Sequence, residues 1–554
     1  MAITRSRRIA AMALVAVTAA AATTMVGTAT SRRFFDDDPI WVERATQDAS
    51  SIKPLEVKLF VDLAYNILTG APVANPGRAK NVNTVDEVPD SSWFTNRVGH
   101  LPLTADDIAR GPDITDGPAP GPWTVTSSKS DGVTPGFTIK DTAGQRWFIK
   151  FDPPGYRGMA TGTEVAATKL MWALGYNVPE NHIAYLHRDQ LIVGSEAKFT
   201  PEGGSARPMR ANDLDRLLAR ADREPDGSYR VVASKALAGT PVGRIRFAGV
   251  RPDDPNDVVP HEDRRELRGY RVFAAWLNHT DAKAINSLDT LVRENGHAYV
   301  RHHLLDFGSV LGSGGVGPAE YWEGREYLVE PKLAAKQIVG FGLIAPSWHR
   351  TAFYESPAIG RVPANAADFD PDQWKPRVPN QAFLHARADD KFWAARKLMA
   401  VTRAMVRAAV HAGQFGDSHA EDVLVQTLVE RRDAIGRAYL TGVNPISEPA
   451  LGEELTFVNA AVEADVARAP RGYRAVWSRF DNATGTTSRI GETSGRTTSL
   501  TLPGGLPTHD GAFIQVSLSA VGATHQSWET PVHAYFRLRH GGWKLVGFER
   551  APTL

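Results

Sequence analysis

The stretch that decides the fold runs from His279 to Asn286, His-Thr-Asp-Ala-Lys-Ala-Ile-Asn, and the triplet Asp306-Phe307-Gly308 follows twenty residues later. Its chemical groups fit magnesium-assisted phosphoryl transfer: a carboxylate for the acceptor hydroxyl, a cation for the phosphate, then an amide and a second carboxylate for the metal. Asp-Phe-Gly alone would arise by chance in roughly one chain of this length in ten, and His-x-Asp-x-Lys-x-x-Asn in roughly one in a thousand. Together they predict a catalytic loop and a metal-binding turn.

Each polar residue of this stretch has an expected role. Asp281 would accept the proton of the acceptor hydroxyl or orient that hydroxyl, and Lys283 would neutralise the phosphoryl group in transit. Asn286 and Asp306 would bind the divalent metal, because magnesium prefers amide and carboxylate oxygens. His279 is expected to be structural, tying the loop to the metal-binding turn, rather than to act as a base.

The residues before the loop supply two more candidates. Two strand-like runs, 137–141 and 146–151, surround a Gly-containing turn and predict a β-hairpin. Lys150 lies on the second run, where a rigid strand would hold its ammonium group in place. A helix capped by threonine is expected at 161–174, and Glu164 in its first turn could form an ion pair with Lys150.

Length and patterning divide the chain into several parts. At 554 residues the sequence is too long for one ordinary core. Helical periodicity is also found at 55–68, 264–277, 389–412 and 419–441, and strand-like alternation begins at about residue 500. The expected division is an export segment at 1–30, a partly helical N-terminal extension at 31–122, a strand-rich region at 123–235, a helical region at 236–445 and a small β-rich C-terminal module at 446–554.

The order of strands, helix and then a helical region with the catalytic loop resembles the protein-kinase-like superfamily. The resemblance covers about residues 123–445 and is closest to the atypical branch that includes HipA-type toxin kinases, CotH-type spore-coat kinases and secreted kinases. It implies a two-lobed, protein-kinase-like α+β fold that binds ATP with Mg²⁺ or Mn²⁺. By the same resemblance, Lys150 would hold the α- and β-phosphates, and Glu164 would hold Lys150.

The sequence also departs from the kinase pattern. No Gly-x-Gly-x-x-Gly precedes Lys150, although Ser, Gly and Pro in 127–136 could cover the phosphates. The gap between Asn286 and Asp306 is longer than usual, which indicates a long hairpin around Asn295-Gly296. No Ala-Pro-Glu follows the metal-binding turn. The last absence argues against a conventional protein-kinase substrate lobe.

The N-terminus predicts export. Arg5, Arg7 and Arg8 precede an uncharged apolar run, 9–27, and small residues follow, as in a signal peptide. The run is also long enough to remain as a single membrane anchor over 9–28. We therefore expect a periplasmic or extracellular protein, either released or anchored.

Composition excludes several classes of function. The 63 Lys and Arg residues nearly balance the 62 Asp and Glu residues, so there is no electrostatic case for nucleic-acid binding. No cysteine is present, which excludes disulfides, Cys-zinc sites and thiol catalysis. His302 and His303, adjacent in a strand-like run, are expected in the core or behind the site rather than as a metal-binding pair.

Three functions remain open from the sequence. The first is an exported ATP-dependent phosphotransferase that acts on a protein, sugar, lipid or small-molecule acceptor. The second is a catalytically silent kinase-like binding module of the cell envelope, which the scarcity of ATP outside the cytosol favours. The third is AMP transfer on the same fold. The four residues Lys150, Asp281, Asn286 and Asp306 favour an enzyme, since a silent domain has no physical need for all of them.

Overall fold

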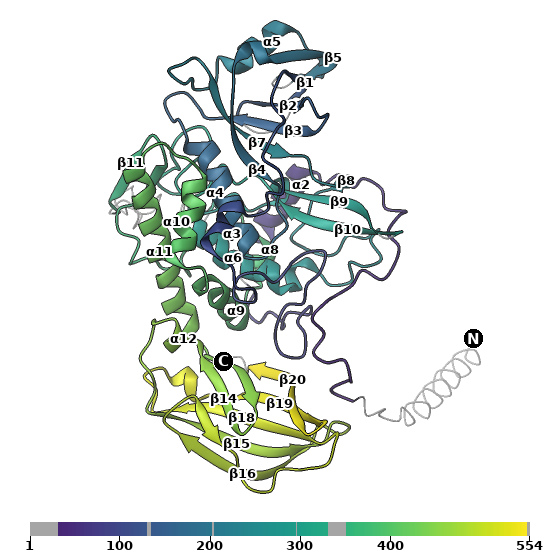
Figure 1. The fold of residues 1–554 in the computed structure, drawn as a ribbon, viewed down its shortest axis with the longest axis vertical. Coiled ribbons are helices and arrows are strands. Elements are labelled where there is room, and N and C mark those ends of the chain that lie inside the picture. Colours follow the sequence, from purple (N-terminus) through teal and green to yellow (C-terminus); the bar gives the residue numbers. More distant parts are fainter. Residues whose placement is uncertain are drawn as a thin grey trace, which may run out of the picture.

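The computed structural model describes residues 32–71, 73–129, 134–201, 204–294, 296–330 and 351–550. Figure 1 shows a strand-rich lobe at the top, a mostly helical lobe in the middle and a β-rich module at the bottom. The α+β class expected from the sequence is confirmed. Within the described residues, no helix has both the length and the apolar character needed to cross a bilayer. The expected export segment at 1–30, with its anchor at 9–28, lies outside the described residues.

The upper lobe is built on one seven-stranded sheet. Its strands are β1 (Trp123–Ser128), β2 (Gly136–Lys140), β3 (Arg146–Phe151), β4 (Asn181–Leu186), β5 (Leu191–Phe199), β6 (Arg207–Pro208) and β7 (Tyr229–Lys235), in the order β4-β7-β3-β2-β1-β5-β6. β1 and β5 are parallel, and all other neighbours are antiparallel. The expected hairpin is β2–β3. Alternate apolar side chains of the sheet pack against helix α5 (Ala211–Leu218). They form a hydrophobic core that is separate from the larger core of the chain.

Helix α4 (Met159–Ala173) follows β3 and differs from the prediction at its start. Its N-cap is Gly158 in a left-handed conformation, φ 83°, and no threonine side chain caps the helix. The buried carboxylate of Asp152, at the end of β3, accepts hydrogen bonds from the backbone N–H groups of Gly158, Ala160 and Thr161, each at 2.9 Å. An acid at the positive end of a helix replaces the local cap. Glu164 consequently lies in the second turn and not the first.

The middle lobe is mostly helical. Its elements are α2 (Leu59–Leu68), α3 (Ala105–Arg110), α6 (Arg265–Leu277), α8 (Gln381–Leu384), α9 (Ala388–Met399), α10 (Arg403–Ala412) and α11 (Ser418–Leu440), with a sheet of β8 (Thr240–Gly243), β9 (Ser287–Glu294) and β10 (His297–Leu304) and a hairpin of β11 (Phe353–Ser356) and β12 (Gly360–Pro363). The prediction of a single helix at 389–412 is wrong. Thr402 accepts a hydrogen bond from Met405 N–H and starts a second helix, α10. The helix expected at 55–68 begins only at Leu59, because Leu55 pairs its backbone with Val242.

The C-terminal module starts directly after α11. It has a three-stranded sheet of β13 (Ile446–Leu451), β14 (Glu454–Asn459) and β17 (Ser499–Thr501), a short helix α12 (Ala460–Glu463), and a five-stranded sheet of β15 (Gly472–Phe480), β16 (Thr487–Gly495), β18 (Phe513–Val521), β19 (Val532–Arg539) and β20 (Gly542–Arg550). Phe34, near the start of the described chain, packs on this larger sheet against Phe480 and Tyr535. The N-terminal extension therefore contacts the C-terminal module.

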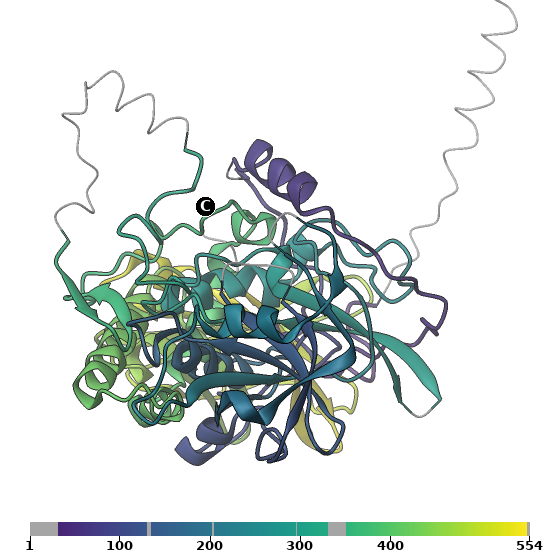
Figure 2. The same cartoon turned by 90° about the horizontal axis from the view of Figure 1, so that it is seen from above.

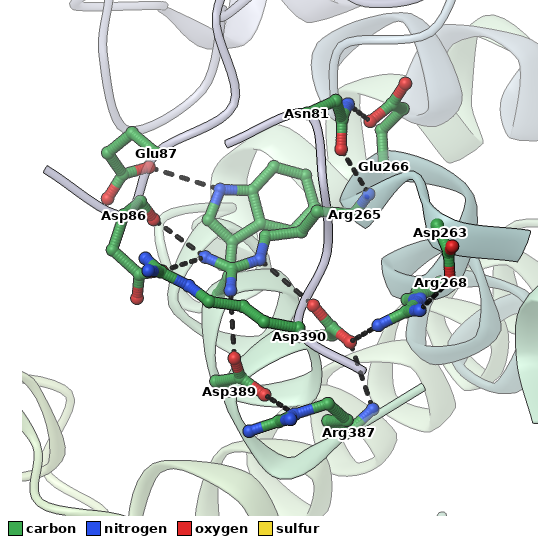
Figure 3. A network of polar contacts seen from close by, with 12 residues as sticks. Asn81, Asp86, Glu87, Asp263, Arg265, Glu266, Arg268, Arg387, Asp389 and Asp390 are labelled. Carbon is green, nitrogen blue, oxygen red and sulfur yellow. Dashed lines mark hydrogen bonds and ion pairs between the residues drawn. The ribbon is translucent and has the colours of Figure 1, made fainter. Parts of the chain in front are cut away.

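Helix α6 crosses the centre of the middle lobe and is held by buried charges at its N-terminal end (Figure 3). Arg265 donates to Asp390 at 3.0 Å, to Asp389 at 3.1 Å and to Asp86 at 2.8 Å. Its side chain has no exposed surface. Burial opposes the charge of Arg265, but attraction by the three carboxylates outweighs burial and raises its pKa. The network joins α6 to α9 and to the N-terminal extension.

Removing the central cation of this network should destabilise the fold. Arg265→Met removes the cation that three carboxylates share and leaves each of them with one other arginine. Breaking buried ion pairs of this kind costs about 3 kcal/mol or more. Urea denaturation should show that loss. Arg407→Met is the matched control, because the Arg407–Asp422 pair on the surface is more than half exposed and should contribute no more than about 1 kcal/mol. Equal effects of the two substitutions would contradict this account of α6.

Candidate functional site

Lys150 joins three separate segments of the chain at one point. Its Nζ lies 2.8 Å from Glu164 Oε2 on α4 and 2.7 Å from Asp306 Oδ1 in the turn after β10. Glu164 has a 1% exposed side chain, and its Oε1 accepts a hydrogen bond from Phe307 N–H at 3.0 Å. Glu164 therefore holds both the ammonium group and the backbone of the turn.

Attraction between Lys150 and its carboxylate neighbours keeps Lys150 and Asp306 in their charged forms. Lys150 lowers the pKa of Asp306 to about 2, against the opposing effect of burial. Burial would lower the pKa of Lys150, but Asp306 and Glu164 outweigh it and raise that pKa. Asp306 is thus a carboxylate and Lys150 an ammonium ion at any pH near neutrality. The side chain of Asp306 is 43% exposed, so its second oxygen can reach a ligand.

The turn that carries Asp306 has little room. Asp306 adopts a left-handed conformation, φ 63°, which is unusual for a residue other than glycine. A Cβ atom added at Gly308 would lie 3.1 Å from Glu164 Oε2, so only glycine fits there without displacing that carboxylate. Phe307 is fully buried, and its ring lies 5.4 Å from that of His279. This contact joins the turn to the loop.

His279 is buried at the start of the loop. Burial lowers its pKa to about 4, although Asp281 and Asp306 act in the opposite direction. The imidazole is therefore neutral near pH 7. Its backbone N–H donates to Ala274 O of α6 at 2.7 Å. The structural role expected for His279 is consistent with this position.

The catalytic loop places its polar groups around Asp281. Lys283 Nζ lies 2.7 Å from Asp281 Oδ1. The Asn286 amide donates to Asp281 O at 2.8 Å and to Oδ2 at 2.9 Å, which leaves the amide oxygen of Asn286 for other partners. Burial would raise the pKa of Asp281, but Lys283, Arg377 and the Asn286 hydrogen bond outweigh it and lower that pKa.

The backbone brings the loop and the turn together. Leu305 N–H donates to Asn286 O at 2.9 Å, so Asn286 and Asp306 occupy neighbouring positions. The intervening residues form the β9–β10 hairpin, which accounts for the long gap between the two motifs. The structure thus brings together all six candidate residues in two linked groups: Lys150, Glu164 and Asp306, and Asp281, Lys283 and Asn286.

The sequence did not single out Arg377, which also reaches the loop. Its backbone N–H donates to Thr280 O at 2.7 Å, and its guanidinium lies 3.8 Å from Asp281 Oδ1 and 2.6 Å from Glu323 Oε1. No motif surrounds Arg377, and it follows the loop by about ninety residues. Only the fold places this second cation beside Asp281.

The residues present fit a metal that arrives with a nucleotide. Among the described residues, no group of three or more His, Cys, Asp or Glu side chains could hold a metal ion alone. The carboxylate of Asp306 and the amide oxygen of Asn286 are hard oxygen ligands, and Mg²⁺ commonly binds through one or two such groups plus phosphate oxygens and water. Of the segment expected to cover phosphates, 127–136, residues 130–133 lie outside the described residues.

Neither a family model nor a curated protein matches this sequence. Two solved structures match it: the Golgi casein kinase, with 11% identity and a TM-score of 0.28, and the Golgi casein kinase with Mn/ADP bound, with 11% identity and a TM-score of 0.27. Each match covers 72% of this chain and 95% of the other chain. At TM-scores this low, the similarity assigns neither a fold nor a function to this chain.

Strand β10, which leads to Asp306, carries a buried histidine with a testable effect of pH. Burial lowers the pKa of His303 from 6.5 to about 4, against the opposing hydrogen bond to Leu288 O. Between these two values the unfolded chain binds a proton that the folded chain excludes, so stability falls as the pH falls from 6.5 to 4.

His303→Gln should remove this part of the acid sensitivity while keeping a donor for Leu288 O. Between pH 7 and pH 5, the free energy of unfolding should fall by about 2 kcal/mol less in the variant than in the wild type. Urea denaturation at both pH values measures the difference. His509→Gln, an exposed position, is the control. An unchanged pH dependence in His303→Gln would show that this histidine is not the group responsible.

Proposed function

We propose that this chain is a kinase-like phosphotransferase that transfers the terminal phosphate of ATP, with Mg²⁺ or Mn²⁺, to an acceptor hydroxyl. The observation that carries the proposal is the position of Lys150, within 2.8 Å of both Glu164 and Asp306. A strand lysine, a helix glutamate and a metal-binding aspartate form the arrangement that phosphoryl transfer on this kind of fold requires. The loop of Asp281, Lys283 and Asn286 next to it supports the same chemistry.

Each residue of the candidate site would have a separate role in phosphoryl transfer. Lys150 would hold the phosphates of the nucleotide, and Asp306 and Asn286 would hold the divalent cation, which offsets charge on the phosphates when bound. Asp281 would orient the acceptor hydroxyl and accept its proton as the bond from the acceptor oxygen to the γ-phosphorus forms and the bond from that phosphorus to the departing ADP breaks. Its lowered pKa makes it a weak base, which suits a loose transition state in which the proton leaves late. Lys283 and Arg377 would offset negative charge beside Asp281.

Substitutions should separate nucleotide binding from turnover. Lys150→Met should abolish or strongly weaken the thermal stabilisation by ATP with Mg²⁺ or Mn²⁺, and Asp306→Asn should remove its dependence on the metal. Asp281→Asn should keep that stabilisation yet lose roughly a hundredfold or more in turnover, because the acceptor hydroxyl loses its proton acceptor. Self-labelling or hydrolysis with γ-labelled and α-labelled ATP measures turnover and distinguishes phosphate transfer from AMP transfer.

Lys140→Met is the matched control, because Lys140 lies ten residues earlier on the adjacent strand and is exposed. It should behave as the wild type. A wild type that binds nucleotide without any turnover would favour the silent binding module. A wild type that binds no nucleotide with any divalent ion would contradict the proposed function.

We also propose that the protein acts outside the cytosol, on the basis of the signal-like residues 5–29. A reporter enzyme that is active only after export should be active when fused after Phe34. An inactive reporter that accumulates in the cytosol would contradict export and would leave the proposed chemistry unaffected.

A further inference from the structure

A cavity of about 380 Å³ lies where three parts of the chain meet. Its walls come from α9 of the middle lobe, from the N-terminal extension between Val85 and His100, and from the C-terminal module at Ser447 and Arg550. In Figure 1 this junction is near the end of β20, below α9. The cavity shares no lining residue with the candidate functional site.

Arg550 is the first unusual feature of this cavity. Its guanidinium stacks on Phe392, with Cζ 4.1 Å from the ring centroid, and its Nη2 donates to Ile446 O at 2.9 Å. Nε and Nη1 are buried and have no hydrogen-bond partner among the described residues. Burial lowers the pKa of Arg550 to about 10, although Asp86 acts in the opposite direction. Two donor nitrogen atoms of this one cation thus have no acceptor in the described part of the chain.

Two further polar side chains, Ser447 and Lys397, line the cavity. Ser447 is only 3% exposed, and its hydroxyl also has no partner among the described residues. Lys397 donates to Asn96 Oδ1 at 2.8 Å and lies over the rings of Phe94 and Trp393, but it forms no ion pair within the described chain. Burial lowers its pKa to about 8.

The acids that line the cavity already have cationic partners. Asp86 pairs with Arg265 at 2.8 Å, and Glu87 pairs with Arg396. Glu448 lies 3.5 Å from the same Arg396. Figure 3 shows Asp86 and Glu87 among the polar contacts around Arg265. Neither Arg550 nor Lys397 forms an ion pair with a described carboxylate, although Asp86 attracts Arg550 and Glu87 attracts Lys397 from farther away.

Two other arginines, the buried Arg431 and the half-buried Arg97, illustrate a purely structural role. Arg431 donates to the carbonyl oxygens of Ala275 and Trp276 at the end of α6. Arg97 donates to the carbonyl oxygens of Trp172 and Tyr176 at the end of α4. These guanidinium groups donate hydrogen bonds to backbone carbonyl oxygens at helix ends, which have no partner within the helix. Among the residues that the structure describes, Arg550 has a single carbonyl acceptor, and its Nε and Nη1 have none.

We propose that this cavity binds a small molecule bearing a phosphate or carboxylate group, with Arg550 and Ser447 donating hydrogen bonds to its oxygens and Lys397 supplying a second positive charge. A buried donor without an acceptor, and a buried cation without an anion, each cost free energy that such a group recovers. A guanidinium fork matches the paired oxygens of both anions. The volume exceeds that of a bare ion, and Trp41 and Phe392 offer apolar wall.

The test is the thermal shift caused by inorganic phosphate and, separately, by acetate at pH 7 and constant ionic strength. At least one anion should raise the melting temperature of the wild type, since it binds the folded state. Lys150→Met should show the same shift, which excludes binding at the candidate functional site. Arg550→Gln should weaken the apparent affinity roughly tenfold or more, because charge-assisted hydrogen bonds are lost. The anion that gives the larger shift identifies the ligand group.

Ser447→Ala should reduce the shift as well, and it carries the test if Arg550→Gln fails to fold, because it removes only one hydroxyl. Arg539→Gln, an exposed position at the end of β19, should keep the wild-type shift. The proposal is overturned if neither anion stabilises the wild type, or if Arg550→Gln and Ser447→Ala keep the full shift.

Discussion

The candidate site depends on the two ion pairs of the Lys150 ammonium group. Two carboxylates, Glu164 and Asp306, approach it from different elements, each within 2.8 Å. Without a cation between them these carboxylates would repel each other in a partly buried place, where screening by water is weak. The hydrogen bond from Phe307 N–H to Glu164 extends the constraint to the backbone, so one charge fixes the sheet, α4 and the turn at Asp306 together.

A second set of buried charges positions the catalytic loop. Arg265 fixes the start of α6 through Asp86, Asp389 and Asp390, and Arg431 donates to the carbonyl oxygens at its end. The loop begins where that end is held. Breaking one partner of such a network is costly because the others stay buried. The helix is therefore a fixed support for the loop.

The sequence predicted the features that depend on local spacing. The loop at 279–286, the turn at Asp306 and the β2–β3 hairpin all follow from residue types a few positions apart, whereas the catalytic and metal-binding roles stay predictions. Features that depend on contacts beyond neighbouring positions were missed or wrong. Asp152, directly after β3, caps α4 from outside the helix, so the expected threonine cap does not form. Arg377 reaches Asp281 only through the fold, and the cavity at Arg550 needs three distant segments to exist.

The central claim is that Asp306 and Asn286 hold a divalent cation beside a nucleotide that Lys150 binds. The most direct measurement is a crystal structure with Mn²⁺ and a non-hydrolysable ATP analogue, in which the anomalous signal of manganese locates the metal. We predict a manganese peak within bonding distance of the Asp306 carboxylate and the Asn286 amide oxygen, with analogue phosphates on Lys150. A structure with the analogue bound elsewhere, or with manganese away from both residues, would contradict the account.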